Sequence, residues 1–206
     1  NELGQNAQMF VDVSVRSLRK VHFYTSLFID EVSIGNMWDA ENHTNLFSWK
    51  AGATWFNVIP NVHLTGEYTK TMPWTYRHQV QSTTFETNNY NIGHYLGENS
   101  DEIYLAATIR PWRLLRIVAA AWHARKGPEH EYEIIAGNAN VTGLDFMAET
   151  AWEQTGVRLT AEWEALNGLL IFINGTWQNS QGEQAYVPNY LSGNIVSLEA
   201  GFRIGW

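Results

Sequence analysis

Hydrophobic and polar residues alternate along most of this chain, and a period of two predicts β-strands whose successive side chains point to opposite faces. In "FVDVSVR", for example, Val11, Val13 and Val15 fall on one face, and Asp12 and Ser14 fall on the other. We expect about eleven such strands, at residues 10–16, 21–30, 47–55, 62–69, 101–110, 114–126, 130–137, 141–153, 157–165, 169–179 and 194–206. The pattern predicts an all-β fold.

Prolines separate the alternating segments. Pro60, Pro73, Pro111, Pro128 and Pro188 all fall between expected strands. Proline cannot donate a hydrogen bond to a β-ladder, so these residues mark the turns.

The connections differ in length in a regular way. Short ones are expected at 17–20, 57–60, 111–113 and 165–168, and long ones near 33–45, 71–100 and 179–192. Several strands reach the ~9–11 residues that a tilted membrane strand needs, and short turns alternating with long loops are typical of outer-membrane barrels. We therefore predict a transmembrane antiparallel up-and-down β-barrel of the outer-membrane type, with residues 1–206 as a single barrel domain. Since eleven is odd and bacterial single-chain barrels have even strand numbers, we expect this chain to be the C-terminal part of a larger barrel, lacking N-terminal strands.

Tryptophans near strand ends favour the same interpretation. Trp55, Trp112 and Trp206 are expected at one rim, and Trp74, Trp122 and Trp152 at the opposite rim. Aromatic girdles lie at both interfaces of a membrane barrel. Periodicity alone is the same in a soluble β domain whose apolar face is a core, and that alternative stays open.

Composition narrows the possible partners. The 206 residues carry 13 Lys and Arg against 21 Asp and Glu, a net charge of −8, which argues against a nucleic-acid partner because phosphate binding needs clustered cations. The chain has no cysteine, so it offers no disulfide or zinc–thiolate site. No run approaches the ~20 consecutive apolar residues of a transmembrane helix.

The middle of the chain carries motifs that are more specific than strand alternation. One strand ends in Asp-Glu, an "EY" strand leads to a Tyr-x-His element, and a loop follows that reads "GHYLGEN". The residues are Asp30, Glu31, Glu67, Tyr68, Tyr76, His78, Gly93, His94, Leu96, Gly97 and Asn99. Their order and spacing, between Phe23 and Asn99, resemble the capsule-assembly Wzi family in its Bacteroidetes form.

The resemblance implies a protein of the bacterial outer membrane that helps to attach or assemble surface or capsular polysaccharide by binding glycan. It implies no enzymatic step, and we predict no cofactor and no metal. The implied partners are outer-membrane lipid and surface polysaccharide, with other outer-membrane proteins as further candidates. Two alternatives remain, a diffusion porin or transport barrel and an accessory component of a secretion or gliding-motility machine.

The connection from Thr71 to Ser100 is the main candidate site, as an extracellular or inward-folded loop. It is too long for a passive connection. Aromatic faces can stack on sugar rings, and amide and hydroxyl groups can bond to sugar hydroxyls. The candidate residues, for glycan binding or for structuring the loop, are Trp74, Tyr76, His78, Tyr90, His94, Tyr95 and Asn99. A loop whose His and Tyr side chains only bond to the barrel wall is the alternative.

Charged residues on the polar faces of the strands are expected to line the lumen. They are Lys50, Glu67, Arg158, Glu162, Glu164 and Arg203. Mixed signs in a lumen indicate interior salt bridges more often than a selectivity filter.

No catalytic or metal-binding residue is predicted. Serines such as Ser26 and Ser48 lack a surrounding nucleophile signature. The segment "HARKGPEHEYE", with His123, His130 and Glu131, is interpreted as a solvated charged loop.

Overall fold

The computed structural model describes residues 8–31, 45–77, 84–88, 90–129 and 144–205, and this part of the chain is all-β. The strands are β1 (Met9–Val15), β2 (Val21–Glu31), β3 (Leu46–Trp55), β4 (Val62–Thr71), β5 (Glu86–Thr87), β6 (Tyr90–Asn91), β7 (Ser100–Trp112), β8 (Leu115–Lys126), β9 (Trp152–Leu166), β10 (Leu169–Gly182) and β11 (Gly193–Ile204). The described residues otherwise contain a single 3-10 turn, Asn189–Leu191, and no α-helix. Accordingly, none of them belongs to a helix that could span a bilayer.

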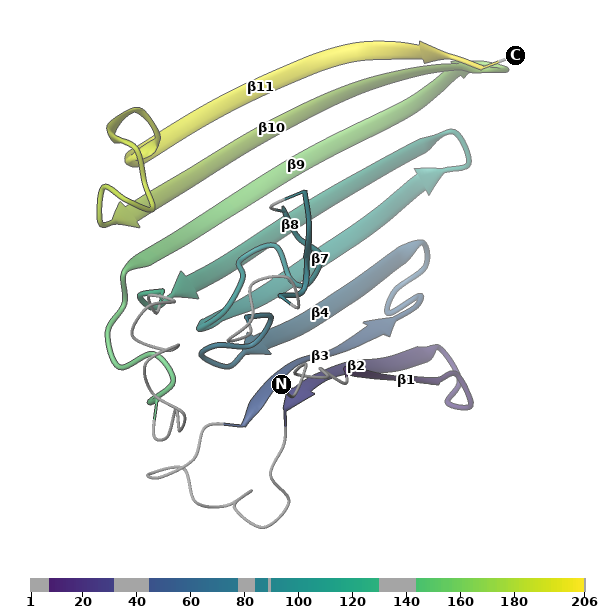
Figure 1. Ribbon diagram of the computed structural model, residues 1–206. Helices are drawn as coiled ribbons and strands as arrows, with labels where there is room; N and C mark the ends of the chain where they lie inside the picture. Colours follow the sequence, from purple (N-terminus) through teal and green to yellow (C-terminus); the bar gives the residue numbers. More distant parts are fainter. Residues whose placement is uncertain (1–7, 32–44, 78–83, 89, 130–143, 206) are drawn as a thin grey trace.

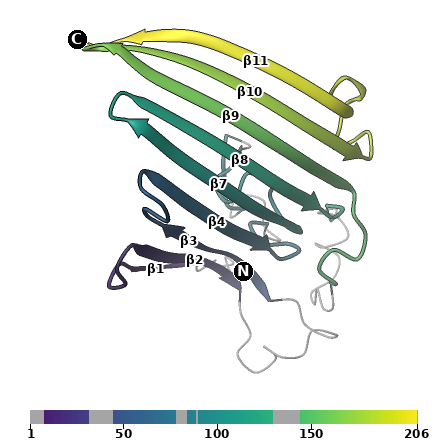
Figure 2. The same ribbon diagram turned by 180° about the vertical axis from the view of Figure 1, so that it is seen from behind.

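Nine strands form one antiparallel sheet in the order β1-β2-β3-β4-β7-β8-β9-β10-β11. β5 and β6 form a separate hairpin within the connection between β4 and β7. Figures 1 and 2 show a curved sheet with β1 and β11 at its two edges. Within the described residues β1 pairs only with β2, and β11 only with β10. The sheet is therefore open, and the predicted closed barrel is not observed in it.

Most expected strands are present, and the differences have local causes. The strand expected at 141–153 is wrong, because residues 144–151 form turns and bends and β9 begins at Trp152. The strand expected at 130–137 lies outside the described residues. Pro111 does not separate two strands but lies near the end of β7, where the register shifts between Ile109 and Trp112. A bulge at a strand end tolerates a residue that cannot donate to the ladder.

Connections of different length gather at opposite ends of the sheet (Figure 1). The short ones are 16–20, 56–61, 113–114 and 167–168, and the long ones include 72–99 and 183–192. This is the asymmetry expected from the sequence. The intervals from β2 to β3 and from β8 to β9 lie partly outside the described residues.

One face of the sheet is apolar and exposed. Leu64, Ala107, Ala119 and Leu159 lie directly opposite one another across β4, β7, β8 and β9. The large exposed hydrophobic residues of this apolar face include Met9, Val11, Val13, Val15, Phe23, Trp55, Leu64, Ile103, Leu105, Trp112, Val157, Leu159, Trp163, Ile171, Ile173, Trp177, Val196, Leu198, Phe202 and Ile204. No described residues form a second layer over it, although soluble monomers rarely expose so large a contiguous patch.

A row of ionisable residues borders the apolar face near the long connections. Lys70, Asp101, Arg125 and Glu153 lie directly opposite one another on β4, β7, β8 and β9. The Arg125 guanidinium donates two hydrogen bonds to the Asp101 carboxylate, at 3.0 Å from Nε and 2.6 Å from Nη2. The apolar face therefore has a polar border at this end.

The tryptophans follow the predicted rims only in part. Trp55 and Trp112 are exposed at the short-turn end of the apolar face. Trp122 and Trp152, expected at the opposite rim, instead lie on the other face of the sheet. Trp74 is buried, and Trp206 lies outside the described residues. The predicted girdle is therefore wrong for Trp74, Trp122 and Trp152.

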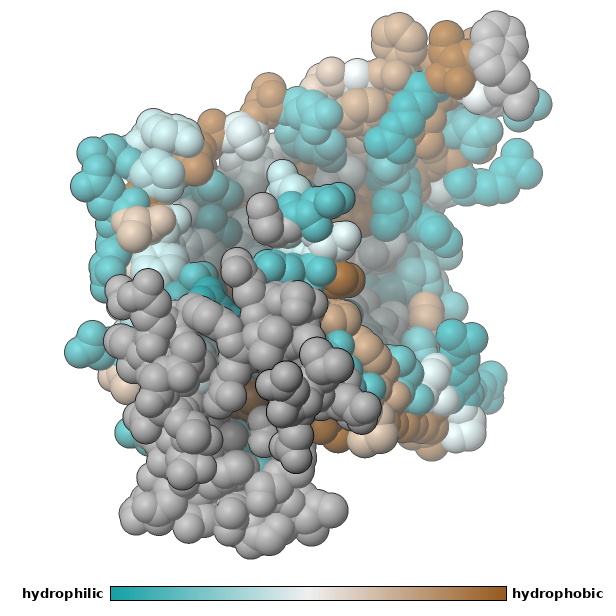
Figure 3. Space-filling view, in the orientation of Figure 1, coloured by the Kyte–Doolittle hydropathy of each residue, from teal (hydrophilic) through white to brown (hydrophobic). Residues whose placement is uncertain are grey.

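The opposite, polar face carries the small core. The buried hydrophobic residues are Phe28, Leu46, Trp74, Tyr76, Leu96, Ala124, Ala151 and Val187. Figure 3 views this side and shows hydrophilic side chains in the hollow of the curved sheet, with hydrophobic ones at its outer rims. The core lies where the long connections meet the sheet, not between two layers.

Three aromatic rings on the polar face lie flat against glycines of the neighbouring strand. The opposing pairs are Tyr24 with Gly52, Trp122 with Gly156, and Phe172 with Gly201. A Cβ added at each glycine would lie within 2.3 to 2.7 Å of the ring atoms. Such pairs cover the glycine backbone and help to fix strand register.

Gly156→Ala is expected to lower the free energy of unfolding by about 1–3 kcal/mol, because its methyl group would overlap the Trp122 ring. The matched control is Gly175→Ala on β10, where an added Cβ meets nothing within 4 Å. Chemical unfolding of the two purified variants measures the difference. Equal stability would contradict the flat packing of the ring.

Candidate functional site

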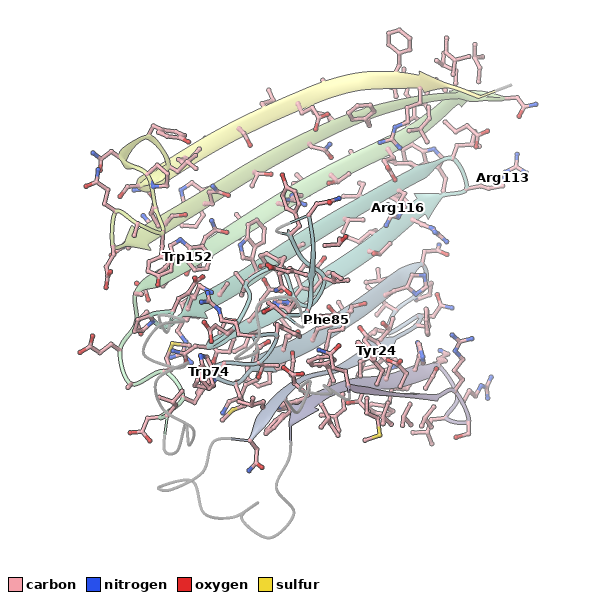
Figure 4. The ribbon with its side chains drawn as sticks, viewed as in Figure 1. Tyr24, Trp74, Phe85, Arg113, Arg116 and Trp152 are labelled. Atoms are coloured by element: carbon pink, nitrogen blue, oxygen red, sulfur yellow. The ribbon has the colours of Figure 1, made fainter. Side chains whose placement is uncertain are left out.

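The connection 72–99 folds back over the polar face. Phe85, just before β5, packs against Phe28 of β2 at 5.0 Å and against Tyr76 at 5.9 Å between ring centroids. Phe28 also contacts Phe10 of β1 at 4.8 Å. Rings at these distances attract each other in tilted or offset arrangements. The cluster therefore anchors the described part of the connection on this side of the sheet, where Figure 4 shows Phe85 in front of the strands.

Asn99 joins this connection to the next long one. Its side-chain Oδ1 accepts a hydrogen bond from the Met147 N–H at 2.9 Å, and its Nδ2 donates to the Pro128 carbonyl at 3.3 Å. Its own N–H donates to the Met72 carbonyl at 3.2 Å. Its side chain is buried, and its φ of 50° lies in the left-handed region, which asparagine tolerates better than most residues.

A balanced ion network lies beside Asn99. The buried Glu98 carboxylate pairs with Arg77 Nε at 2.8 Å and accepts a hydrogen bond from the Trp74 N–H at 2.5 Å. Glu129 pairs with Lys126 at 3.1 Å and with Arg77. Burial raises the pKa of Glu98 although Arg77 opposes the shift. Burial would also raise the pKa of Glu129, but Lys126 and Arg77 outweigh it and lower that pKa. Two cations and two carboxylates therefore neutralise one another here.

The structure divides the predicted site residues into buried and exposed ones. Trp74 and Tyr76 are each 6% exposed and Asn99 is 2% exposed, so none of them offers a free surface to a ligand. Tyr90 and Tyr95 are 76% and 69% exposed. The accessible aromatic surface of the connection is thus carried by Tyr90 and Tyr95.

His94 is intermediate in exposure between the buried and the exposed candidate residues. Its ring packs against Tyr95 at 4.7 Å. Burial, and to a lesser extent the Lys50 cation, lowers its pKa from 6.5 to about 4, which leaves the ring neutral at pH 7. Its Nδ1 has no hydrogen-bond partner in the described part of the chain. His78, the remaining candidate, lies outside the described residues.

The residues predicted to line a lumen all lie on the polar face. They are Lys50, Glu67, Arg158, Glu162, Glu164 and Arg203. Arg116 pairs with Glu162 at 2.8 Å, and the Tyr24 hydroxyl donates to Glu67. Part of the mixed charge is thus engaged in cross-strand contacts.

Two of the hollows formed by the described residues open on the polar face. One, of about 400 Å³, lies within the connection beside Tyr76, Phe85 and the ion network. The other, of about 480 Å³, lies between Tyr95 and strands β7 to β10. A larger hollow on the apolar face has an almost entirely apolar lining, so it lacks the convergent polar groups of a specific site.

Sequence reasoning missed most of the sheet residues that line the second hollow. Tyr104, Trp122, Gln154 and Gln178 all contribute to it. Alternation could have placed each of them on a polar face, but only the strand register brings them together.

The serines and the histidine considered for hydrolase or metal chemistry bond to neighbouring strand residues where they are described, and His130 and Glu131 lie outside the described residues. Ser48 Oγ bonds to Thr71 Oγ1 at 2.8 Å, and Ser26 donates to Asp12. His123 Nδ1 pairs with Thr155 Oγ1 at 2.8 Å. The described residues contain no group of three or more His, Asp or Glu side chains arranged to hold a metal ion.

Comparison with known proteins leaves the family open. No protein-family model matches the chain, and no curated protein matches it either.

Asn99→Gly is expected to loosen the connection 72–99, because it removes two side-chain hydrogen bonds while keeping the positive φ accessible. Asn88→Gly is the matched control, since Asn88 has the same φ of 50° but is exposed. Limited proteolysis with mass spectrometry should detect faster cleavage within 72–99 in the first variant only. Identical cleavage rates would contradict the anchoring role.

Proposed function

We propose that this chain forms part of the wall of an outer-membrane β-barrel that binds surface polysaccharide without catalysis, as the Wzi resemblance implies. The observation that carries the proposal is the exposed apolar face on a sheet whose other face is polar. In lipid such a face needs no second protein layer, because acyl chains cover it.

The dimensions of the apolar face fit a bilayer. On β10 it runs from Leu169 through Ile171, Ile173 and Gly175 to Trp177. At ~3.4 Å per residue this is about 27 Å along the strand. A strand tilt of ~40° reduces it to roughly 21 Å, close to the ~25 Å apolar band of outer-membrane barrels. The border of Lys70, Asp101, Arg125 and Glu153 then lies at headgroup depth on the long-loop side.

The edges of the sheet fit a larger barrel. Because successive strands are antiparallel, β1 and β11 run in the same direction. An antiparallel ring that includes both needs an odd number of additional strands, which gives an even total as in bacterial single-chain barrels. Long unpaired edges are otherwise prone to aggregation.

Glycan binding is proposed for the connection 72–99 together with the polar face. The connection is anchored by its aromatic cluster and ion network, and it holds Tyr90 and Tyr95 exposed. Exposed rings on a fixed support can stack on sugars with little loss of conformational entropy.

A diffusion porin is the second candidate, favoured by the mixed charges of the polar face. Single-channel conductance in planar bilayers distinguishes the two. A steady open channel would favour the porin, and a silent barrel would favour glycan attachment.

Leu159→Lys should abolish recovery from the outer membrane, because a lysine in the middle of the apolar band costs about 2–4 kcal/mol. Thr160→Lys, one residue along on the polar face, should be recovered normally. Membrane fractionation and heat-dependent migration in SDS gels measure both variants. Equal recovery of the two, together with solubility in plain buffer, would exclude a lipid-facing apolar surface.

Replacing Tyr90 and Tyr95 together with alanine should release surface polysaccharide into the medium, because both rings are exposed on the anchored connection. Tyr190→Ala is the control, since Tyr190 is 80% exposed on the connection 183–192. The ratio of cell-bound to released polysaccharide is measured at equal protein level. An unchanged ratio in the double variant would remove the connection from the proposed function.

A further inference from the structure

The second hollow of the polar face has the composition of a ligand site. It lies between Tyr95 of the anchored connection and the strands β7 to β10. Tyr104 and Trp122 supply further aromatic surface, and Gln154 and Gln178 supply amides. Figure 4 shows Arg116, which also lines the hollow, on β8 toward the short-turn end.

Trp122 forms a prepared stacking surface. Its indole lies so close to Gly156 that an added Cβ would approach Cζ2 to 2.3 Å. Its Nε1 donates to Gln154 Oε1 at 2.9 Å, and Gln154 Nε2 donates in turn to Ser180 Oγ at 2.9 Å. One side of the ring is thus held against β9, and the ring orientation is fixed before a ligand arrives.

The Arg158 guanidinium lies over this ring, within cation–π distance. Its guanidinium carbon is 5.5 Å from the Trp122 ring centroid, and its Nε donates to Thr176 Oγ1 at 3.3 Å. Arg116 is paired with Glu162 at 2.8 Å, whereas Arg158 forms no ion pair with the described carboxylates. The charge of Arg158 is therefore available to an anionic group.

The one carboxylate that lines the hollow is engaged. The Tyr95 hydroxyl donates a hydrogen bond to Glu102, which joins the connection to β7 across the hollow. This contact holds Tyr95 in place, and Arg158 is the cation lining the hollow that forms no ion pair with a described carboxylate.

We infer that this hollow binds an acidic sugar residue, with the sugar ring stacked on Trp122, its carboxylate on Arg158 and its hydroxyls on Gln154 and Gln178. Arginine binds carboxylates with two parallel hydrogen bonds, and a planar aromatic ring with neighbouring amides suits a sugar ring. The inference rests on the proposed function. It adds the class of sugar that is bound and the strand residues that select this sugar.

Calorimetric titration of the purified, detergent-solubilised protein with a galacturonic acid trisaccharide and with maltotriose tests this inference. The acidic trisaccharide should bind at least about tenfold more tightly than the neutral one, because a charge-assisted contact to arginine is lost in maltotriose. Arg158→Gln should remove the preference, and Trp122→Ala should weaken binding of both sugars. Trp177→Ala is the control that should bind normally, because Trp177 lies on the apolar face of β10.

The outcomes separate the inference from the proposed function. Equal binding of the two sugars, or normal acidic-sugar binding by folded Trp122→Ala, would overturn the inference. If Trp122→Ala fails to fold, Arg158→Gln decides alone, since it leaves the ring and its glycine contact intact. Loss of polysaccharide retention in the Tyr90 and Tyr95 variant, combined with no acidic-sugar binding, would overturn the inference and leave the proposed function standing.

Discussion

The antiparallel ladder with nearly unbroken register is the constraint on which the rest of the structure depends. Side chains alternate between faces at every residue, so one uncorrected slip would exchange the apolar and polar sets of a strand. Across nine strands the rows stay aligned, as at Leu64, Ala107, Ala119 and Leu159. The register shifts near the short turns fall beside Trp112, where β7 ends, and beside Leu169, where β10 begins. Both faces therefore keep their character over the length of the sheet.

A sheet with one exposed apolar face must find its stability outside a conventional core. The described residues bury few hydrophobic side chains, and these gather where the long connections meet the sheet. Backbone hydrogen bonds between strands and cross-strand side-chain contacts stabilise the rest of the sheet. Arg125 with Asp101 and Arg116 with Glu162 illustrate this on opposite faces. The apolar surface left over is best matched by a solvent that is itself apolar, and this is the physical basis of the membrane proposal.

The connection 72–99 is a long loop that packs onto the polar face of the sheet. Among its described residues, the Trp74 N–H donates to the Glu98 carboxylate and the Met72 carbonyl accepts from the Asn99 N–H, as irregular backbone requires when it is buried. Its Arg77 and Glu98 form ion pairs in a network that also includes Lys126 and Glu129. Trp74 and Tyr76, which the sequence analysis proposes as ligand contacts, are instead buried where they anchor the connection. The side chains that a ligand can reach are therefore Tyr95 and the residues on the polar face of the sheet beneath it.

The sequence by itself determined the strands, the alternation of faces and the grouping of short and long connections, because these follow from local periodicity and from proline placement. Alternation also placed Lys50, Glu67 and Arg158 on the polar face. Only the tertiary structure decided that Trp122 lies flat on Gly156. The same holds for the buried Asn99 side chain, which bonds to Pro128 and Met147 of the next connection. These outcomes depend on which strands are neighbours and in what register, which no single segment encodes. The sequence likewise could not show that residues 144–151 are turns, because a short apolar run reads equally well as a strand until its partners are known.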